Sequence, residues 1–474
     1  MAARSQEVMA VGTNGERTMT DSTPDPYTMP EGGTRESPTS FTARLKYLGP
    51  SIIISGSIVG SGEIILTSSL GAAAGFLLLW WVLLSCWIKS LVQAELSRYI
   101  IVSGDTYLRA LNRLPGKIPG PRGPVAWPIW LGLIAFIPGI MGLSGILGGA
   151  GQALTLLIPQ MPSTWSTAFV AMATAGILAA GSYKALEKIL LGLVVGFTAC
   201  TLVCATLMQF TEFSMSAADI ASGLTFEFPL EYLVLALAVY GYTGVNSNET
   251  AAYTYWCIEK GYPGYIGHDR QDPAWRQRAE GWIRVLHLDV WATLLILTCA
   301  TIPFYLLGAG VLHAMGEQPD GLETISVLSN MFTATLGGWS LWIFGAGAFF
   351  ILFSTTLSGV GGAGRIIPDY LIELGLFPRS NLPLRKAWTR GFVICAPLFG
   401  LLCYVAVPNP VFLVTIGAVT AALMLPIQSG ATLWLQARHL DVRIHPRKAA
   451  KIAIATIFCF QLLMAGLLIR YIVF

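Results

Sequence analysis

The chain has 474 residues, of which 54% are hydrophobic and only 12% are charged, and its formal net charge is +3. About a quarter of the residues of a soluble protein are Asp, Glu, Lys or Arg, so this composition excludes a soluble enzyme and a soluble nucleic-acid-binding protein. Fifty Gly and 14 Trp are typical of a polytopic membrane protein, in which Gly is frequent within the helices and Trp collects at the interfaces. The small net charge does not indicate a polyanionic partner.

The N-terminal segment, residues 1–43, is rich in Ser, Thr, Gly, Pro and Glu, so it is expected to be a disordered cytoplasmic tail. Residues 44–474 are expected to form a transmembrane domain. A helix needs about 20 mostly apolar residues to cross a bilayer, and on this basis the sequence predicts an all-α polytopic protein with eleven transmembrane helices. They are expected at about residues 47–67, 71–97, 127–156, 165–182, 187–210, 230–256, 285–312, 338–364, 391–408, 411–436 and 450–474.

The basic residues give an independent test of this topology, because Lys and Arg are retained on the cytoplasmic side of a membrane protein. If the N-terminus is placed inside, the tail and the inner connectors hold 27 of the 29 Lys and Arg residues, and the outer connectors hold none. We therefore predict a multi-pass protein of the cell (inner) membrane with a cytoplasmic N-terminus. The two remaining cations, Lys89 and Arg470, are expected to extend toward an interface.

Two of the predicted spans, the first and the sixth, are interrupted by small and polar residues. The first contains Gly60-Ser61-Gly62-Glu63, preceded by Val59, and the sixth contains Asn246-Ser247-Asn248-Glu249, preceded by Val245. The two motifs share Val, Ser and Glu and are separated by an odd number of spans. This spacing predicts an inverted repeat, with one half at about 47–210, the other at about 230–436 and an extra helix at about 450–474.

Interrupted helices at corresponding positions of two inverted halves indicate the central binding site of a transporter. Unwound backbone at membrane depth is tolerated only where it lines a cavity or is buried in protein. The predicted substrate-binding residues are Gly60, Ser61, Gly62, Thr243, Asn246 and Ser247. Acidic residues inside a membrane are costly and usually functional, so Glu63 and Glu249 are predicted to bind a coupling ion or a proton.

Further motifs resemble the NRAMP family of divalent-metal transporters (the SLC11-like proteins). They are Gly49-Pro50 at the start of the first span, Gln93 to Arg98 in the second and Leu425-Pro426 in the tenth. The eleven predicted spans agree with this family as well. The resemblance implies a LeuT-type fold, with two inverted five-helix repeats, broken helices 1 and 6, and alternating access to a central site.

The signature motifs of that family are replaced in this chain. Its Asp-Pro-Gly-Asn motif corresponds to Gly60–Glu63, its Met-Pro-His triplet to Asn246–Asn248, and a frequent Gln of its tenth helix falls near Ala418. A soft or borderline transition metal favours N or S ligands, and these positions offer none. In addition, Ile58–Gly62 resembles the Gly-Ser-Gly break of amino-acid transporters with this fold, which implies backbone amides that hold a substrate carboxylate.

These features favour a secondary transporter that binds a small anion, bicarbonate or a small carboxylate, in symport with Na⁺ or H⁺ and with no further cofactor. The alternative is a carrier of a hard divalent cation such as Mg²⁺ or Mn²⁺, bound by the oxygen atoms of Glu63, Asn246 and Glu249. A channel or a membrane receptor is less favoured, because the polar interruptions are local and the connectors are short. The expected partners are the substrate and membrane lipid, not nucleic acid, and the protein is expected to be a monomer. No HExxH, P-loop or Gly-x-Ser-x-Gly element indicates an enzyme.

Overall fold

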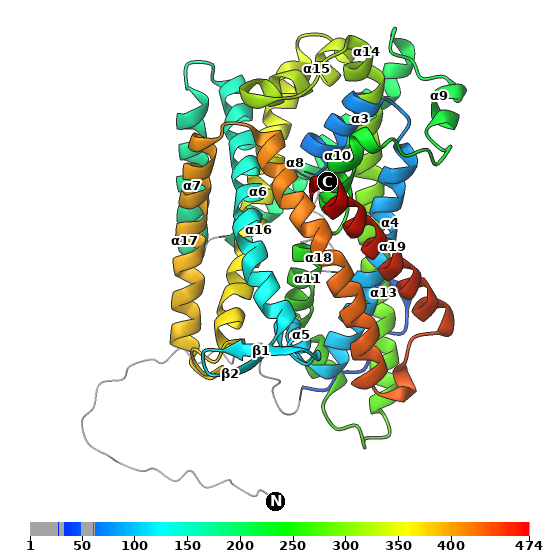
Figure 1. Ribbon diagram of the computed structural model, residues 1–474, viewed down its shortest axis with the longest axis vertical. Helices are drawn as coiled ribbons and strands as arrows, with labels where there is room; N and C mark the ends of the chain where they lie inside the picture. The colour runs from blue at the N-terminus through cyan, green and yellow to red at the C-terminus, as the bar shows by residue number, and fades with distance from the viewer. Residues whose placement is uncertain (1–26, 28–32, 49–59, 61, 182, 474) are drawn as a thin grey trace, which may run out of the picture.

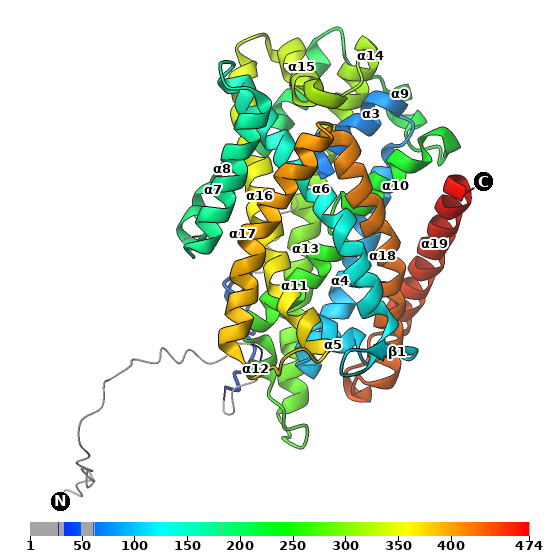
Figure 2. The same cartoon turned by 60° about the vertical axis from the view of Figure 1, so that its left-hand side comes forward.

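The computed structural model describes residues 27, 33–48, 60, 62–181 and 183–473. Much of the first predicted span, including Ser61, therefore lies outside the described residues. The chain is mostly helical, and its long helices run side by side along the long axis of the molecule (Figure 1). The last helix, α19, lies at the edge of this bundle in both side views (Figures 1 and 2).

The long helices and the two halves of the sixth span account for most of the bundle. They are α4 (Leu79–Ser103), α6 (Trp127–Leu157), α7 (Ser163–Ala179), α8 (Tyr183–Leu207), α10 (Leu233–Tyr242), α11 (Ser247–Glu259), α13 (Trp275–Leu307), α16 (Ser340–Glu373), α17 (Leu382–Ala406), α18 (Pro410–Arg438) and α19 (Lys448–Val473). The described part of the first span is a π-helical turn, η1 (Gly62–Thr67), followed by α3 (Ser68–Ala74).

Shorter elements connect these helices. They are α1 (Phe41–Leu45), α5 (Tyr107–Leu111), β1 (Lys117–Gly120), β2 (Gly123–Ala126), α9 (Ala217–Ser222), α12 (Tyr262–Ile266), α14 (His313–Met315) and α15 (Thr324–Leu336), with single turns at Met208–Phe210, Leu230–Tyr232, Gly308–Leu312, Gly321–Glu323 and Val442–Ile444. The two strands form an antiparallel hairpin in which Lys117 pairs with Ala126.

Seven helices in the described residues are long and apolar enough to cross a membrane. They are Trp127–Leu157, Gly192–Phe210, Trp275–Met315, Ser340–Glu373, Leu382–Ala406, Pro410–Arg438 and Lys448–Tyr471. Large apolar side chains on the outer helices are exposed, as expected where lipid replaces water; examples are Met172 on α7, Leu402 on α17 and Leu463 on α19. These features are those of a multi-pass membrane protein.

The second predicted span begins later than the sequence suggested. Residues 71–74 continue α3, the chain turns at Gly75, whose φ is 58°, and α4 starts only at Leu79. The turn residues are apolar, so hydropathy alone did not separate the two helices. A positive φ is readily adopted by Gly and rarely by other residues, and it ends α3 at this point.

Part of the segment that the sequence assigned to the disordered tail contacts the bundle. The amide of Arg35 donates to the carbonyl of Tyr265 at 3.0 Å, and the indole of Trp282 donates to the carbonyl of Arg35 at 2.9 Å. Arg35 therefore joins this segment to α12 and to α13.

Glycines allow the central helices to approach closely. A Cβ atom at Gly417 of α18 would lie 2.6 Å from the Cα atom of Gly142 on α6, and one at Gly241 of α10 would lie 1.9 Å from the carbonyl oxygen of Ala418. Small residues at such crossings are the usual means of helix association in membranes. Helix α18 is thereby held against both α6 and the first half of the sixth span.

This packing predicts a large cost for Gly241→Ala. The added methyl group overlaps the backbone of α18, and we expect a loss of about 1–3 kcal/mol in the free energy of unfolding. Gly196→Ala on α8 is the matched control, because no atom lies within 4 Å of its Cβ position. Thermal unfolding of the detergent-solubilised protein measures both. Equal unfolding temperatures for the two variants would contradict the proposed role of this contact.

Candidate functional site

The sixth span is interrupted between α10 and α11, as the sequence predicted. Thr243 at the end of α10 is extended, with ψ of 132°, and Gly244 has a φ of 70°. A Cβ atom at Gly244 would lie 3.1 Å from the Cα atom of Cys86 on α4. Gly244 therefore serves both the turn and the close approach of α4 to the unwound segment.

Asn246 and Glu249 are joined by a reciprocal pair of hydrogen bonds at the start of α11. The amide of Glu249 donates to Asn246 Oδ1 at 2.9 Å, and the amide of Asn246 donates to Glu249 Oε2 at 3.1 Å. This is a capping box, and it satisfies backbone donors that a helix start leaves without partners. Glu249 therefore has a structural contact in addition to any role in binding an ion.

Glu63 makes the same type of contact in the first span. Its Oε2 atom accepts the amide of Gly60, three residues earlier, at 3.0 Å. Its Oε1 atom accepts the hydroxyl of Thr301 on α13 at 3.2 Å and the amide of Gly244 at 3.5 Å. The carboxylate is completely buried. Glu63 thus links the two interrupted segments.

A second contact between the breaks involves two threonines. The hydroxyls of Thr67 and Thr243 lie 2.9 Å apart, and Thr67 also donates to the carbonyl of Gly62 at 2.8 Å. A Cβ atom at Gly62 would lie 2.8 Å from the carbonyl oxygen of Tyr242. The two motifs that the sequence paired therefore lie in direct contact.

A cavity of about 170 Å³ adjoins this junction. Of the predicted site residues, Gly62, Asn246, Ser247 and Glu249 line it. Gly60, Thr243 and Glu63 are buried and are not part of the lining, and Ser61 lies outside the described residues. From the junction the cavity extends past α6 and α16 to Tyr107, Pro128 and Tyr370. These last residues belong to α5, the start of α6 and α16, and α5 lies near the end of the bundle that carries the β-hairpin (Figure 1).

Three buried polar atoms of the lining have no hydrogen-bond partner in the described part of the chain. They are Ser247 Oγ, Thr355 Oγ1 and Gln428 Oε1. Gln428 Nε2 donates to the carbonyl of Ser247 at 2.7 Å and to the Tyr107 hydroxyl at 2.9 Å. Because a carbonyl can only accept, this contact fixes the orientation of the amide and leaves Oε1, an acceptor, without a donor among the described residues. Such an atom requires a water, a donor or a cation.

Sequence reasoning missed Gln428 and Thr355. It considered a glutamine in the tenth span only near Ala418, whereas Ala418 packs beneath Gly241 and Gln428 lies in the cavity. A polar residue within the tenth span was the available signal for Gln428. Thr355 gave no comparable signal, since hydroxyls are common in packed membrane helices.

The prediction for Lys89 was wrong. Its side chain does not extend to an interface but is 1% exposed, and its ammonium donates to the carbonyls of Tyr240 and Thr243 at the end of α10. The Tyr240 ring centroid lies 5.1 Å from the ammonium. A cation inside a membrane is costly and usually pairs with a charge or with backbone carbonyls. The position of Lys89 within an apolar span was therefore the available signal for this contact.

No group of three or more His, Cys, Asp or Glu side chains that could hold a metal ion occurs among the described residues. The described lining offers one carboxylate, Glu249, several amide and hydroxyl oxygens, and the thioether of Met424. The oxygen atoms suit a hard cation that keeps part of its water shell. A soft metal would find one sulfur and no His or Cys among the described lining residues.

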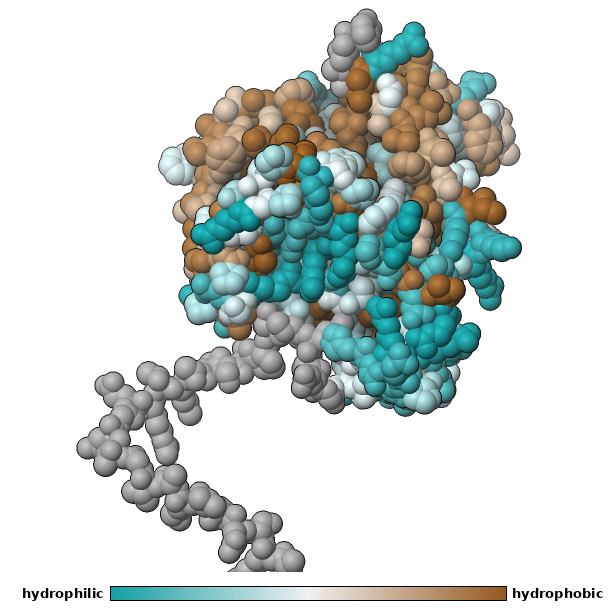
Figure 3. Space-filling model, turned by 60° about the horizontal axis from the view of Figure 1, so that its bottom comes forward, coloured by the Kyte–Doolittle hydropathy of each residue, from teal (hydrophilic) through white to brown (hydrophobic). Residues whose placement is uncertain are grey.

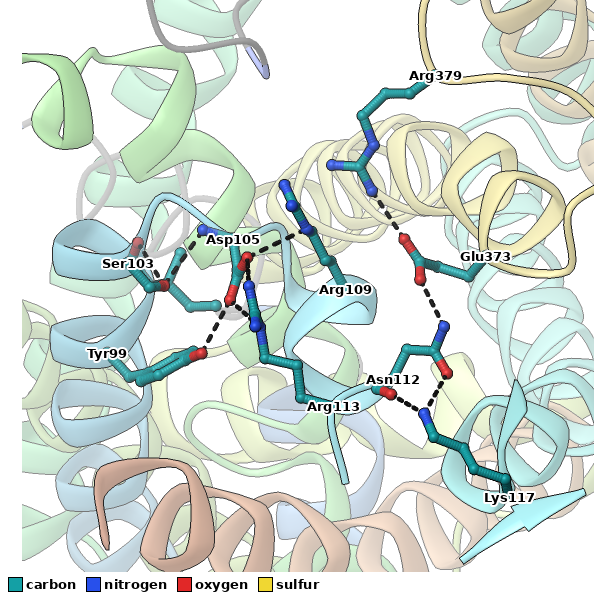
Figure 4. A network of polar contacts seen from close by, with 10 residues as sticks. Tyr99, Ser103, Asp105, Arg109, Asn112, Arg113, Lys117, Glu373 and Arg379 are labelled. Carbon is teal, nitrogen blue, oxygen red and sulfur yellow. Dashed lines mark hydrogen bonds and ion pairs between the residues drawn. The ribbon is translucent and has the colours of Figure 1, made fainter. Parts of the chain in front are cut away.

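A polar network fixes the end of the cavity that is remote from the break (Figure 4). Asp105, which is 2% exposed, binds Arg113 at 2.6 Å and Arg109 at 3.3 Å and accepts the hydroxyl of Tyr99 at 2.8 Å. On the other side of α5, Asn112 donates to Glu373 of α16 at 2.7 Å. Helix α5, which contributes Tyr107 and Leu111 to the lining, is thus held between α4 and α16.

The contact of Gly62 with the other break predicts that Gly62→Ala strongly reduces transport. The added methyl group would separate the two interrupted segments at the carbonyl of Tyr242, and we expect at least a tenfold loss of uptake. Gly139→Ala is the control in the same cavity, since nothing lies within 4 Å of its Cβ position. If the Gly62→Ala protein took up substrate in proteoliposomes at the wild-type rate, this geometry would be contradicted.

The network around Asp105 predicts that Asp105→Asn destabilises the protein by about 2–4 kcal/mol, because a buried carboxylate that binds two arginines loses its charge. Glu280→Gln, which breaks an exposed ion pair with Arg276, is expected to cost at most about 0.5 kcal/mol. Thermal unfolding compares the two. The reverse order of their unfolding temperatures would show that the network does not hold α5.

Comparisons with known proteins agree with this architecture. A manganese transporter of Eremococcus coleocola matches with a TM-score of 0.65 at 16% identity, covering 91% of this chain and 88% of that one. Mhp1, a nucleobase-cation-symport-1 family transporter, matches with a TM-score of 0.54 at 15% identity, covering 83% and 79%. These likenesses show a LeuT-type fold.

Two relatives are similar in sequence. A divalent metal cation transporter, MntH, of Verminephrobacter eiseniae is 24% identical over 400 residues, which are 82% of this chain and 81% of that protein. An uncharacterised protein of Pasteurella multocida is 24% identical over 345 residues, or 72% and 73%. Residues 51–470 match the model of the natural resistance-associated macrophage protein-like family. As the motifs of the first, second and tenth spans suggested, the chain belongs to the Nramp family of membrane transporters.

Proposed function

We propose that this protein is a secondary active transporter with eleven membrane-crossing segments, of which ten form two inverted repeats and the last is an extra helix. The contacts of the two acidic residues support the repeat. Glu63 accepts the amide of Gly60 and Glu249 accepts the amide of Asn246, in each case three residues earlier in the chain. Equivalent positions of the two motifs thus make equivalent contacts, which is expected of two halves that share a backbone conformation.

The proposed orientation places the β-hairpin end in the cytoplasm. Hydrophilic side chains cover this end of the molecule in the view from below (Figure 3), and Arg109, Arg113 and Lys117 belong to its connectors. Cytoplasmic connectors carry an excess of Lys and Arg. The cavity extends toward this end, so this arrangement is inward-facing in the cell membrane.

The substrate proposed for the cavity is a hard divalent cation, Mn²⁺ or Mg²⁺, bound through oxygen. The observation that carries this proposal is the acceptor-only Gln428 Oε1 in the same lining as the carboxylate of Glu249. No Lys or Arg is among the described lining residues, so an anion would meet an acceptor and a carboxylate without a balancing charge. Oxygen ligands and retained water are what Mg²⁺ and Mn²⁺ prefer.

The names of the relatives also favour a divalent cation over an anion as the substrate. Two of the proteins that this chain resembles are named as a manganese transporter and a divalent metal cation transporter. The sequence had placed a small anion first because the family's sulfur and nitrogen ligands are replaced. Their loss argues against a soft metal but not against a hard one. Of the predicted oxygen ligands, Asn246 and Glu249 line the cavity, whereas Glu63 is buried and is not part of the lining.

A small anion such as bicarbonate is the second candidate, and one observation favours it. Within the described residues, the backbone amides of Ser247 and Asn248 at the start of α11 have no acceptor. Amides at a helix start favour negative charge. The carboxylate of Glu249, however, already occupies this helix end and would repel a second anion. H⁺ or Na⁺ is the proposed coupling ion for either substrate.

Two substitutions of Glu249 separate its charge from its contact with the helix. Glu249→Gln retains an acceptor suited to the capping box but removes the charge, and we expect at least a tenfold loss of Mn²⁺ and Mg²⁺ uptake with little change in stability. Glu249→Ala removes both and is expected to lower the free energy of unfolding by about 1 kcal/mol as well. Glu231→Gln, at an exposed position, is the control.

The experiment is uptake by the purified protein in proteoliposomes under a pH or Na⁺ gradient, with Mn²⁺, Mg²⁺ and labelled bicarbonate as separate probes. The cation proposal requires saturable metal uptake that falls in Glu249→Gln. Saturable bicarbonate uptake without metal uptake would reverse the order of the two candidates. Flux that neither saturates nor follows a gradient would contradict a secondary transporter.

A further inference from the structure

The carbonyls at the end of α10 are held by a charged side chain from another helix. An α-helix leaves its last carbonyls without intrahelical donors, and at a break inside a membrane no bulk water replaces them. Lys89 of α4 donates to the carbonyls of Tyr240 and Thr243. The ammonium therefore satisfies the end of the first half of the sixth span.

The unwound segment whose carbonyls Lys89 binds also carries the contacts of two acidic residues. Glu63 and Glu249 accept the amides of Gly244 and Asn246 in this segment. Cys86 lies one turn earlier on α4, and the Tyr240 ring packs on the ammonium. The break thus has a cation on its carbonyl side and carboxylates on its amide side.

In transporters with broken helices, the free carbonyls at the end of a half-helix commonly coordinate a coupling cation. An ammonium group carries the same charge as Na⁺. It donates hydrogen bonds to the carbonyl oxygens that would otherwise coordinate the ion. Since Lys89 already occupies the carbonyls of α10, a mobile ion has no place there.

We propose that Lys89 is a built-in cation at the end of α10, which fills the position that Na⁺ would otherwise take. It fixes the unwound segment through the transport cycle and makes transport independent of Na⁺. Lys89 acts as a positioning residue, because it is absent from the lining of the cavity. This inference concerns the coupling ion and builds on the proposed transport function.

The test replaces Lys89 with methionine, which is similar in length and uncharged. Removal of the ammonium leaves the carbonyls of Tyr240 and Thr243 without this donor, and these are the oxygen atoms that Na⁺ is expected to bind. We expect the unfolding temperature of Lys89→Met to be higher in NaCl than in choline chloride of the same ionic strength, by on the order of 3 °C. The wild-type protein is expected to unfold at the same temperature in both salts.

Gln93→Met is the matched control. Gln93 lies on the same helix, is completely buried, and its side-chain amide has no partner in the described residues. A general effect of a buried methionine on α4 would therefore appear in both variants, whereas a response to Na⁺ is expected only in Lys89→Met. Lys89→Gln, which can donate to one carbonyl, is expected to respond less than Lys89→Met.

Transport gives the second measurement. Mn²⁺ uptake by the wild-type protein is expected to be equal in Na⁺ and choline, and residual uptake by Lys89→Met is expected to be at least fivefold higher in Na⁺. Na⁺-dependent stability or uptake of the wild-type protein would overturn the proposal. The proposal would also be overturned if Na⁺ neither stabilised nor activated Lys89→Met. The same holds if neither Lys89→Met nor Lys89→Gln folded in NaCl. The unfolding measurement uses no substrate, so it remains decisive if the proposed substrate is wrong.

Discussion

Polar backbone that is unwound at membrane depth must find partners within the protein, and this requirement organises the centre of the molecule. Between α10 and α11, the amides of Gly244 and Asn246 donate to Glu63 and Glu249, and the carbonyl of Thr243 accepts from Lys89. Because an unpaired backbone group costs several kcal/mol in hydrocarbon, each of these charged residues stabilises the interruption. A polar cavity at this depth depends on their contacts.

The sequence predicted the features that are local in the chain. The break of the sixth span follows from Gly244 and from the Asn246–Glu249 pattern, which is readable as a capping box. Long apolar stretches located the helices but not all of their ends. The apolar turn at Gly75 separates α3 from α4, and α13, α16 and α17 extend nine or ten residues beyond the predicted spans, because a helix can continue into polar residues outside its apolar part. Such features depend on neighbours within about one helical turn, so a single sequence contains them.

The features that the sequence did not predict depend on contacts between distant segments. Whether Lys89 reaches an interface or the end of α10 depends on how α4 lies against the break, which Gly244 permits by its lack of a side chain. Gln428 became a candidate ligand only because its amide nitrogen is committed to Ser247 and Tyr107. The sequence placed an anion before a divalent cation, and the proposal reverses this order. A sequence lists the polar atoms but does not show which of them are already paired.

Glu63 and Glu249 occupy equivalent positions in the two motifs but have different surroundings. Glu63 is completely buried beneath Thr301 of α13, whereas Glu249 is partly exposed at the cavity. Among the described residues, the cavity adjoins Glu249 and does not include Glu63 in its lining. The two acidic residues therefore make the same contact with the amide three residues earlier but differ in their access to the cavity, because the helices that pack over each motif are different.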